Sequence, residues 1–218
     1  MQERCERFRA IMCTEDENPS IVDDLYRFRK RLFVDRQGWD LAVEDGRERD
    51  QFDTDAAVHC ALFEGAQLIG GFRAIRTDHD YLAQSVFPYL ASLKPYPRQR
   101  NAWEISRFGV LPGGPPRTAL TTYALMFRFA QMRQAATLVA VADLHHERLM
   151  TRVGIRTRRY GPPQVVGTTG DGSPILAVAG EIPLREQTGT RFSSLLEFAK
   201  DVEIDDEALV LGPARVSA

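Results

Sequence analysis

The amino-acid sequence predicts an α/β fold in which helices cover both faces of a mixed β-sheet. Two observations support this prediction. Apolar residues recur at helical spacing in several segments, whereas others are short apolar runs bounded by turn residues such as Glu64-Gly65. The two kinds of segment alternate along the chain, which is typical of a sheet covered on both sides. No repeat or linker interrupts residues 1–218, so we expect one domain with a core of about 20–185 and a tail of about 190–218.

Each helix and strand is predicted from a local pattern of residues. A helix is predicted over 20–36, because Val22, Leu25 and Tyr26 begin a helical repeat that Ser20 is able to cap. The other predictions are strands at 57–63 and 67–76, a short helix or irregular segment at 80–93, a strand at 102–110, a helix at 117–135, a strand at 137–142, a helix at 145–153 and two strands within 164–183. The tail is predicted to be a weak helix followed by a loose acidic segment.

The composition is ordinary for a globular protein. Apolar residues make up 44%, charged residues 27% and the net charge is −2, so nothing favours nucleic acid or an anionic membrane as a partner. No window approaches the roughly 18 apolar residues of a membrane helix, and the N-terminus has no signal-peptide pattern. Cys5, Cys13 and Cys60 form no CxxC pair and the histidines lack ligand spacing, so we expect a cytoplasmic protein without a structural metal.

Several charged residues are candidates for chemistry. Seven carboxylates surround Trp39 and Phe52 in the segment 39–55, which is either a solvated loop or a site for a cationic ligand. Glu104 and Arg107 lie in one apolar strand, three positions apart, and share a face only if a β-bulge intervenes. They are either a structural ion pair or solvent-facing residues, or they have a functional role, because burying an unpaired charge is costly.

Other charged residues carry the same ambiguity. Arg29 and Arg73 are either surface arginines or partners of carboxylates, and His145 and His146 suit a helix cap or the surface. A basic group is either a solvated helix end or a docking surface for a phosphopantetheine carrier protein or the phosphates of coenzyme A. Its members are Arg148, Arg152, Arg156, Arg158 and Arg159.

Together and in this order, these residues resemble the acyl-homoserine-lactone synthases, the LuxI-type autoinducer synthases of quorum sensing. The matching positions are Arg29, Phe33, Trp39, the run Glu48–Asp53, Arg73, Phe87 and the run Glu104–Phe108. The resemblance implies a GNAT-like (acyl-CoA N-acyltransferase-like) fold, in which a central pair of strands, here 102–110 and 137–142, splays apart to admit a pantetheine arm. The usual acetyltransferase pyrophosphate loop is not evident, which favours a synthase.

The resemblance also implies a reaction. An acyl group passes from acyl-CoA or an acyl-carrier protein to the amine of S-adenosylmethionine, and the product closes to a lactone and releases methylthioadenosine. S-adenosylmethionine is then a substrate, and no cofactor, nucleic acid or membrane is expected. The alternatives are a GNAT-type N-acyltransferase that uses another amine, and a non-catalytic ligand-binding module.

Roles follow from the resemblance for the matching residues. Glu104 is the expected general base, directly or through a water, with Asp50 as the second choice. The other expected roles are S-adenosylmethionine binding by Phe33, Trp39, Asp50, Asp53, Ser106 and Arg107, organising ion pairs by Arg29, Glu48 and Arg73, and an acyl and pantetheine pocket at Phe87, Phe108 and Ala142.

The acyl group is only partly constrained by the sequence. Family members that make 3-oxo products often have a threonine where this chain has Ala142, so we expect an acyl chain without a 3-oxo group. The sequence is also similar to the branch that takes short branched or aryl acyl-CoA.

Overall fold

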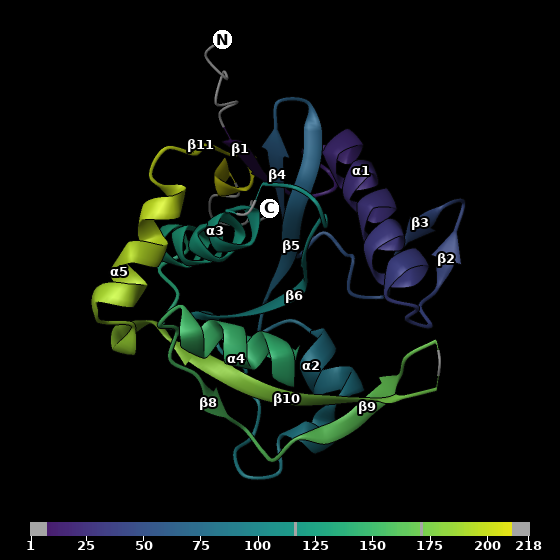
Figure 1. Ribbon diagram of the computed structural model, residues 1–218, viewed down its shortest axis with the longest axis vertical. Coiled ribbons are helices and arrows are strands. Elements are labelled where there is room, and N and C mark those ends of the chain that lie inside the picture. Colours follow the sequence, from purple (N-terminus) through teal and green to yellow (C-terminus); the bar gives the residue numbers. More distant parts are fainter. Residues whose placement is uncertain (1–7, 116, 171, 211–218) are drawn as a thin grey trace, which may run out of the picture.

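The computed structural model describes residues 8–115, 117–170 and 172–210 and is built around one large sheet. The strand order is β11-β1-β4-β5-β6-β7-β10-β8, and β9 pairs with β10 (Figure 1). The strands are β1 (Phe8–Cys13), β4 (Ala57–Glu64), β5 (Gln67–Arg76), β6 (Ala102–Val110), β7 (Thr137–Asp143), β8 (Arg158–Arg159), β9 (Gln164–Thr168), β10 (Pro174–Pro183) and β11 (Glu203–Asp206), with β2 (Val43–Glu44) and β3 (Arg47–Glu48) in a separate hairpin.

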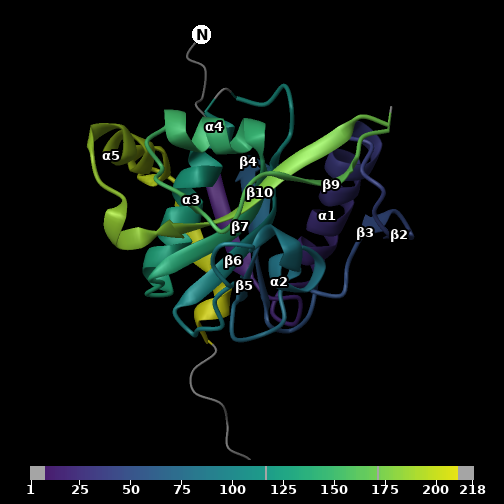
Figure 2. The same cartoon turned by 90° about the horizontal axis from the view of Figure 1, so that it is seen from below.

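Helices cover both faces of the sheet, as the sequence predicts. The α-helices are α1 (Pro19–Arg29), α2 (Leu82–Val86), α3 (Thr118–Met132), α4 (Leu144–Arg152) and α5 (Thr190–Leu196). A π-helix, η1 (Lys30–Arg36), continues α1, and 3-10 turns are η2 (Pro88–Leu90), η3 (Leu184–Glu186), η4 (Glu197–Ala199) and η5 (Glu207–Val210). Viewed from below, α3, α4 and α5 lie on one side of the strands, and α1 and α2 lie on the other (Figure 2).

Most predicted elements are present with small shifts. The strands predicted at 67–76 and 102–110 match β5 and β6, because apolar runs bounded by turn residues define both ends. The predicted cap Ser20 is wrong: Asn18 caps α1, since its Oδ1 accepts from the amide of Ile21 and Pro19 occupies the first turn.

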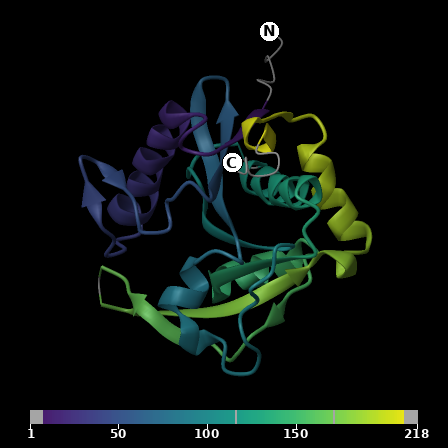
Figure 3. The ribbon, with the colours of Figure 1, turned by 180° about the vertical axis from the view of Figure 1, so that it is seen from behind.

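The two ends of the described chain differ from the prediction. β1 was not predicted, and the tail predicted to be loose contains β11, which pairs with β1 in parallel. α5 lies beside α3 in the view from behind (Figure 3). After α3, Arg133 donates two hydrogen bonds of 2.7 and 2.8 Å to Asp206 of β11, which anchors this edge of the sheet.

The expected parting of the central strands is confirmed. β6 and β7 pair in parallel only where Ala102–Glu104 meets Thr137–Val139, and no pairing joins the later residues of the two strands. In Figure 1 the strands on the two sides of this junction run in diverging directions. On the far face, α3 packs on β5 and β6 while α4 packs on β7 and β10, so the gap between β6 and β7 runs between these two helices.

Two predictions made from the composition concern membrane helices and cysteines. Within the described residues, no helix combines the length and apolarity needed to cross a membrane. Cys13 and Cys60 are buried free thiols, whereas Cys5 lies outside the described residues.

We expect Asp206→Ala to lower the free energy of unfolding by about 3–5 kcal/mol, because it leaves the buried Arg133 without its partner. The side chains of Arg133 and Asp206 are 9% and 4% exposed. The matched control is Asp205→Ala on the same strand, whose pair with Arg9 is half exposed and is worth about 1 kcal/mol or less. Urea unfolding of both variants measures the difference, and equal losses would contradict the anchoring role of Arg133.

Candidate active site

A network of arginines and carboxylates lies on the α1 face of the sheet. Its members are Arg29 of α1, Glu48 of β3, Asp50 and Asp53 of the loop after β3, Arg73 of β5 and Arg107 of β6. These residues come from five separate segments of the chain, so the network holds α1 and the acidic loop against the sheet. Asp50 is the most exposed member, with 18% of its side chain open to solvent.

Asp53 is the centre of this network. Its oxygens accept from Arg29 at 2.8 and 2.9 Å, from Arg73 at 2.9 Å and from the amide of Asp50 at 2.8 Å. Burial alone would raise the pKa of Asp53, but the hydrogen bonds from Arg29 and the charge of Arg73 outweigh it and hold that pKa well below its ordinary value. The ion pairs expected for Arg29, Glu48 and Arg73 are present.

The β-bulge on which one prediction depended is present in β6. Gly71 pairs with Gly109 and Arg73 pairs with Ser106, so two residues of β6 stand opposite one of β5. Arg107 lies in this bulge with φ of 52°. The bulge turns its guanidinium to the face of Glu104 and Ser106, where it donates to Glu48 and Asp50.

Those contacts of Arg107 are short. Its Nε lies 3.0 Å from Oε2 of Glu48, and its Nη2 lies 2.9 Å from Oε1 of Glu48 and 2.7 Å from Oδ2 of Asp50. Ser106 lies beside it and accepts from Nε of Arg73 at 3.1 Å. The bulge therefore joins Arg107 to the hydrogen-bonded group that already contains Arg73, Asp50 and Ser106.

Glu104 precedes Ser106 by two positions on β6, so the two side chains lie on the same face of the strand. The side chain of Glu104 is buried. Its two carboxylate oxygens accept from the backbone N–H groups of Leu82 at 3.1 Å and Ala83 at 2.6 Å, at the start of α2. Burial raises the pKa of Glu104 to about 7, and the two backbone hydrogen bonds and Arg73 only partly oppose this. A carboxyl group with such a pKa exchanges protons near neutral pH.

The aromatic pair predicted for this region consists of Phe33, which lies in η1, and Trp39, which follows the end of η1. Phe33 and Trp39 stack with ring centroids 5.1 Å apart and planes inclined by 20°. A Cβ placed on Gly109 would lie 2.2 Å from Cδ2 of Leu32 and 3.4 Å from Cζ of Phe33, so η1 packs closely against β6 at this glycine. Phe33 therefore packs against β6 at Gly109, which follows Arg107 by two residues. Short π-helices are frequent at functional sites.

The structure adds detail to two expectations about individual residues. Asp53 was expected to contact a ligand, but its carboxylate has no exposed surface and its acceptor positions are filled, so it belongs with the organising ion pairs. Phe87 was grouped with Phe108 and Ala142, but it packs with the cluster on the α2 face, whereas the other two pack on the α3 face. The gap between β6 and β7 lies between the two faces at this point.

Other predicted positions lie at the surface. His146 is at the start of α4, where Asp143 caps the helix by accepting from its backbone N–H at 2.8 Å. In the basic group, Arg158 and Arg159 are paired with Glu186 and Glu147. The remaining three, Arg148, Arg152 and Arg156, are exposed.

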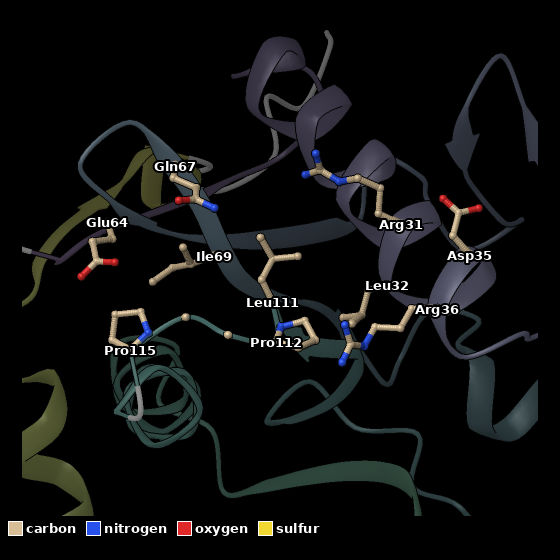
Figure 4. Close-up of a pocket in the computed structure, with 12 residues that line it drawn as sticks. Arg31, Leu32, Asp35, Arg36, Glu64, Gln67, Ile69, Leu111, Pro112 and Pro115 are labelled. Carbon is tan, nitrogen blue, oxygen red and sulfur yellow. The ribbon is translucent and has the colours of Figure 1, made fainter.

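A groove of about 740 Å³ lies between η1 and the loop after β6 (Figure 4). Arg31, Asp35 and Arg36 line one side, and Pro112 and Pro115 lie on the other. None of the sequence-predicted site residues lines it. The ion-pair network and the stacked rings, rather than this groove, therefore define the candidate site.

Sequence reasoning missed several parts of the site. The backbone N–H groups of Leu82 and Ala83 carry no side-chain signal, so nothing in the sequence indicates that they bind Glu104. His59 pairs with Arg73 in the β4–β5 ladder, and burial lowers the pKa of its imidazole to about 3, so the ring is neutral beside the network. The only sign of this in the sequence is that His59 is a polar residue within an otherwise apolar strand.

We expect Asp53→Asn to lower the free energy of unfolding by about 3–5 kcal/mol at pH 7, because Arg29 and Arg73 lose the charge that compensates their burial. The pKa of Asp53 is lower in the folded state, so its stabilisation is present above the unfolded value of about 3.9 and is lost as the pH falls towards the folded value. The gap between wild type and variant should therefore narrow below about pH 4. Urea unfolding across pH measures this, with the exposed Asp55→Asn as control; a gap independent of pH would contradict it.

Comparison with known proteins places this geometry in a family. The family model described as autoinducer synthase matches residues 13–179. An acyl-homoserine-lactone synthase of Aeromonas salmonicida is 34% identical over 154 residues, which cover 67% of this chain and 74% of that protein.

Solved structures show the same fold. TofI, whose structure is a ternary complex with an inhibitor and MTA, is 28% identical with a TM-score of 0.71, over 86% of this chain and 99% of that one. BjaI, a CoA-dependent acyl-homoserine lactone synthase, is 22% identical with a TM-score of 0.79, over 95% of each chain. The resemblance drawn from the sequence is confirmed, and the chain belongs to the autoinducer synthase family.

Proposed function

We propose that this chain is an acyl-homoserine-lactone synthase. It transfers an acyl group from a thioester to the amine of S-adenosylmethionine, then closes the lactone and releases methylthioadenosine. The observation that carries the proposal is the Arg107–Asp50 pair on the strand that parts from β7, with Phe33 of the Phe33–Trp39 stack packed near Gly109 of the same strand. The family of the chain supports the same conclusion.

S-adenosylmethionine suits the residues around Asp50. Its sulfonium is a cation that binds against an aromatic face with about 1–2 kcal/mol, and the Phe33–Trp39 pair offers such a face. Asp50 is the partly exposed carboxylate, suited to the positive amino group, and Arg107 to the substrate carboxylate. The hydroxyl of Ser106 accepts from Arg73 and still has a hydrogen to donate.

Glu104 is the proposed general base. At neutral pH a carboxyl group with a pKa of about 7 is ionised in roughly half of the molecules and is well matched to an ammonium donor. Both of its oxygens already accept from α2, so we propose that a water carries the proton from the amine. Asp50 is the poorer base because Arg73, Arg107 and the amide of Phe52 already donate to it.

The thioester is proposed to enter the gap between β6 and β7. Beyond Glu104 the β7-facing edge of β6 has no strand partner among the described residues, so a backbone N–H near Phe108 or Gly109 is suited to stabilise the oxyanion. The methionyl carboxylate then attacks its own γ-carbon and displaces methylthioadenosine. This step is intramolecular and needs positioning rather than a protein nucleophile. Burial raises the pKa of Cys13 to about 12, which fits that requirement.

The donor is acyl-CoA or an acyl-carrier protein, and the exposed Arg148, Arg152 and Arg156 are suited to the anionic surface of either. We propose an acyl chain without a 3-oxo group, because Ala142 offers no hydroxyl to a keto oxygen. We also propose a cytoplasmic location, where S-adenosylmethionine and acyl thioesters are made.

The decisive experiment mixes the full chain with S-adenosylmethionine and a panel of acyl-CoA and acyl-carrier-protein thioesters, saturated and 3-oxo. We expect methylthioadenosine and an acyl-homoserine lactone without a 3-oxo group, identified by mass spectrometry. Thiol release with another amine and no methylthioadenosine would indicate a general N-acyltransferase. Binding of S-adenosylmethionine without any thiol release would indicate a non-catalytic module.

We expect Glu104→Gln to lower kcat by about 10²-fold or more, because an amide cannot accept the proton from the amine. In the wild type, kcat should rise with pH through about 7 as Glu104 loses its proton, and this limb should disappear in the variant. Calorimetric titration with S-adenosylmethionine is the control, since binding should persist. An unchanged pH profile would remove Glu104 from proton transfer.

A further inference from the structure

A second aromatic pair lies on the α3 side of β6, in the part of this strand that no longer pairs with β7. Tyr123 of α3 lies with its ring centroid 4.4 Å from that of Phe108, and the planes are inclined by 31°. Only 3% of Tyr123 is exposed. Phe108 is the residue of β6 that directly follows the bulge at Arg107, so this pair stands where the strand turns away from β7.

Tyr123 belongs to the buried cluster against which both Phe108 of β6 and Ala142 of β7 pack. Burial raises the pKa of Tyr123, and the charge of Asp143 at the end of β7 adds a smaller effect in the same direction. The hydroxyl therefore stays protonated, and the gap contains a neutral aromatic ring.

Little free volume lies beside β7 on the side of α4. A cavity of about 20 Å³ lies between β7, β10 and α4, which is room for about one water molecule. Ala142, the residue expected to face the acyl chain, is part of its lining. The outer boundary is formed by Glu147 and Arg159, which are joined by two hydrogen bonds of 2.6 Å.

We propose that Tyr123, stacked on Phe108, is a specificity-determining residue that restricts the donor to short, branched or aryl acyl groups. This inference rests on the proposed function. A long chain that enters the gap meets the Tyr123 ring on one side and the closed space beside Ala142 on the other. A compact branched or flat aryl group lies against the two rings without displacing them, and aromatic groups gain from such contacts.

The test compares donors of different size on one set of enzymes. The full chain and its variants Tyr123→Leu, Tyr123→Phe and Phe127→Leu are assayed for methylthioadenosine with butyryl-, isovaleryl-, benzoyl- and decanoyl-CoA. Phe127 is the matched control, because it lies on the same helix but packs against Phe192 of α5. The ratio of kcat/KM values for decanoyl and isovaleryl donors is compared, since any loss of folded enzyme cancels in that ratio.

We expect the wild type to favour the isovaleryl or benzoyl donor over decanoyl. Tyr123→Leu should raise the decanoyl-to-isovaleryl ratio by about tenfold or more, since an apolar pocket discriminates by about 10–200-fold per methylene. Tyr123→Phe and Phe127→Leu should leave it near the wild-type value, because the ring at position 123 is kept in both.

Three results would overturn the proposal: a wild type that prefers decanoyl-CoA, an unchanged ratio in Tyr123→Leu, or an equal shift in Tyr123→Phe or Phe127→Leu. Failure of the proposed function is distinct, because it would appear as an absence of methylthioadenosine from the wild type with every donor, including carrier-bound chains.

Discussion

Arg73 has no exposed surface, and a positive charge in such a place must be compensated by nearby carboxylates. Asp50 and Asp53 supply that compensation, and Asp53 also serves Arg29. Because these residues come from α1, β5 and the loop after β3, the charges are satisfied only when all three segments are in place. The acidic loop, which has little apolar surface of its own, thereby gains a fixed position beside β6.

The same electrostatic requirement shapes β6. Arg107 reaches Glu48 and Asp50 only because a bulge turns it to the face of Ser106, and the bulge uses a backbone conformation that residues other than glycine seldom adopt. Strain of this kind persists where surrounding contacts enforce it, and such places are often functional. β6 therefore supplies Glu104 and Arg107 to one face of the sheet and Phe108 to the other, at the point where it leaves β7.

Much of this arrangement follows from sequence patterns, and the exceptions have physical reasons. The bounds of β5 and β6 are predictable because local apolar runs end at turn residues, and Glu104 and Arg107 stand out as charges in an apolar strand. Local patterns do not reveal the partners of Glu104, which are backbone amides more than 20 residues away. Nor do they reveal β11, whose acidic sequence looks solvated but whose Asp206 is buried against Arg133.

β11 forms the outermost strand of the sheet and covers β1, which would otherwise present unpaired backbone groups along that edge. β1 and β11 are the first and last strands of the described chain, so their pairing joins residues of very large sequence separation. Contacts of this kind form slowly, because ordering the long intervening chain costs conformational entropy before the contact is gained.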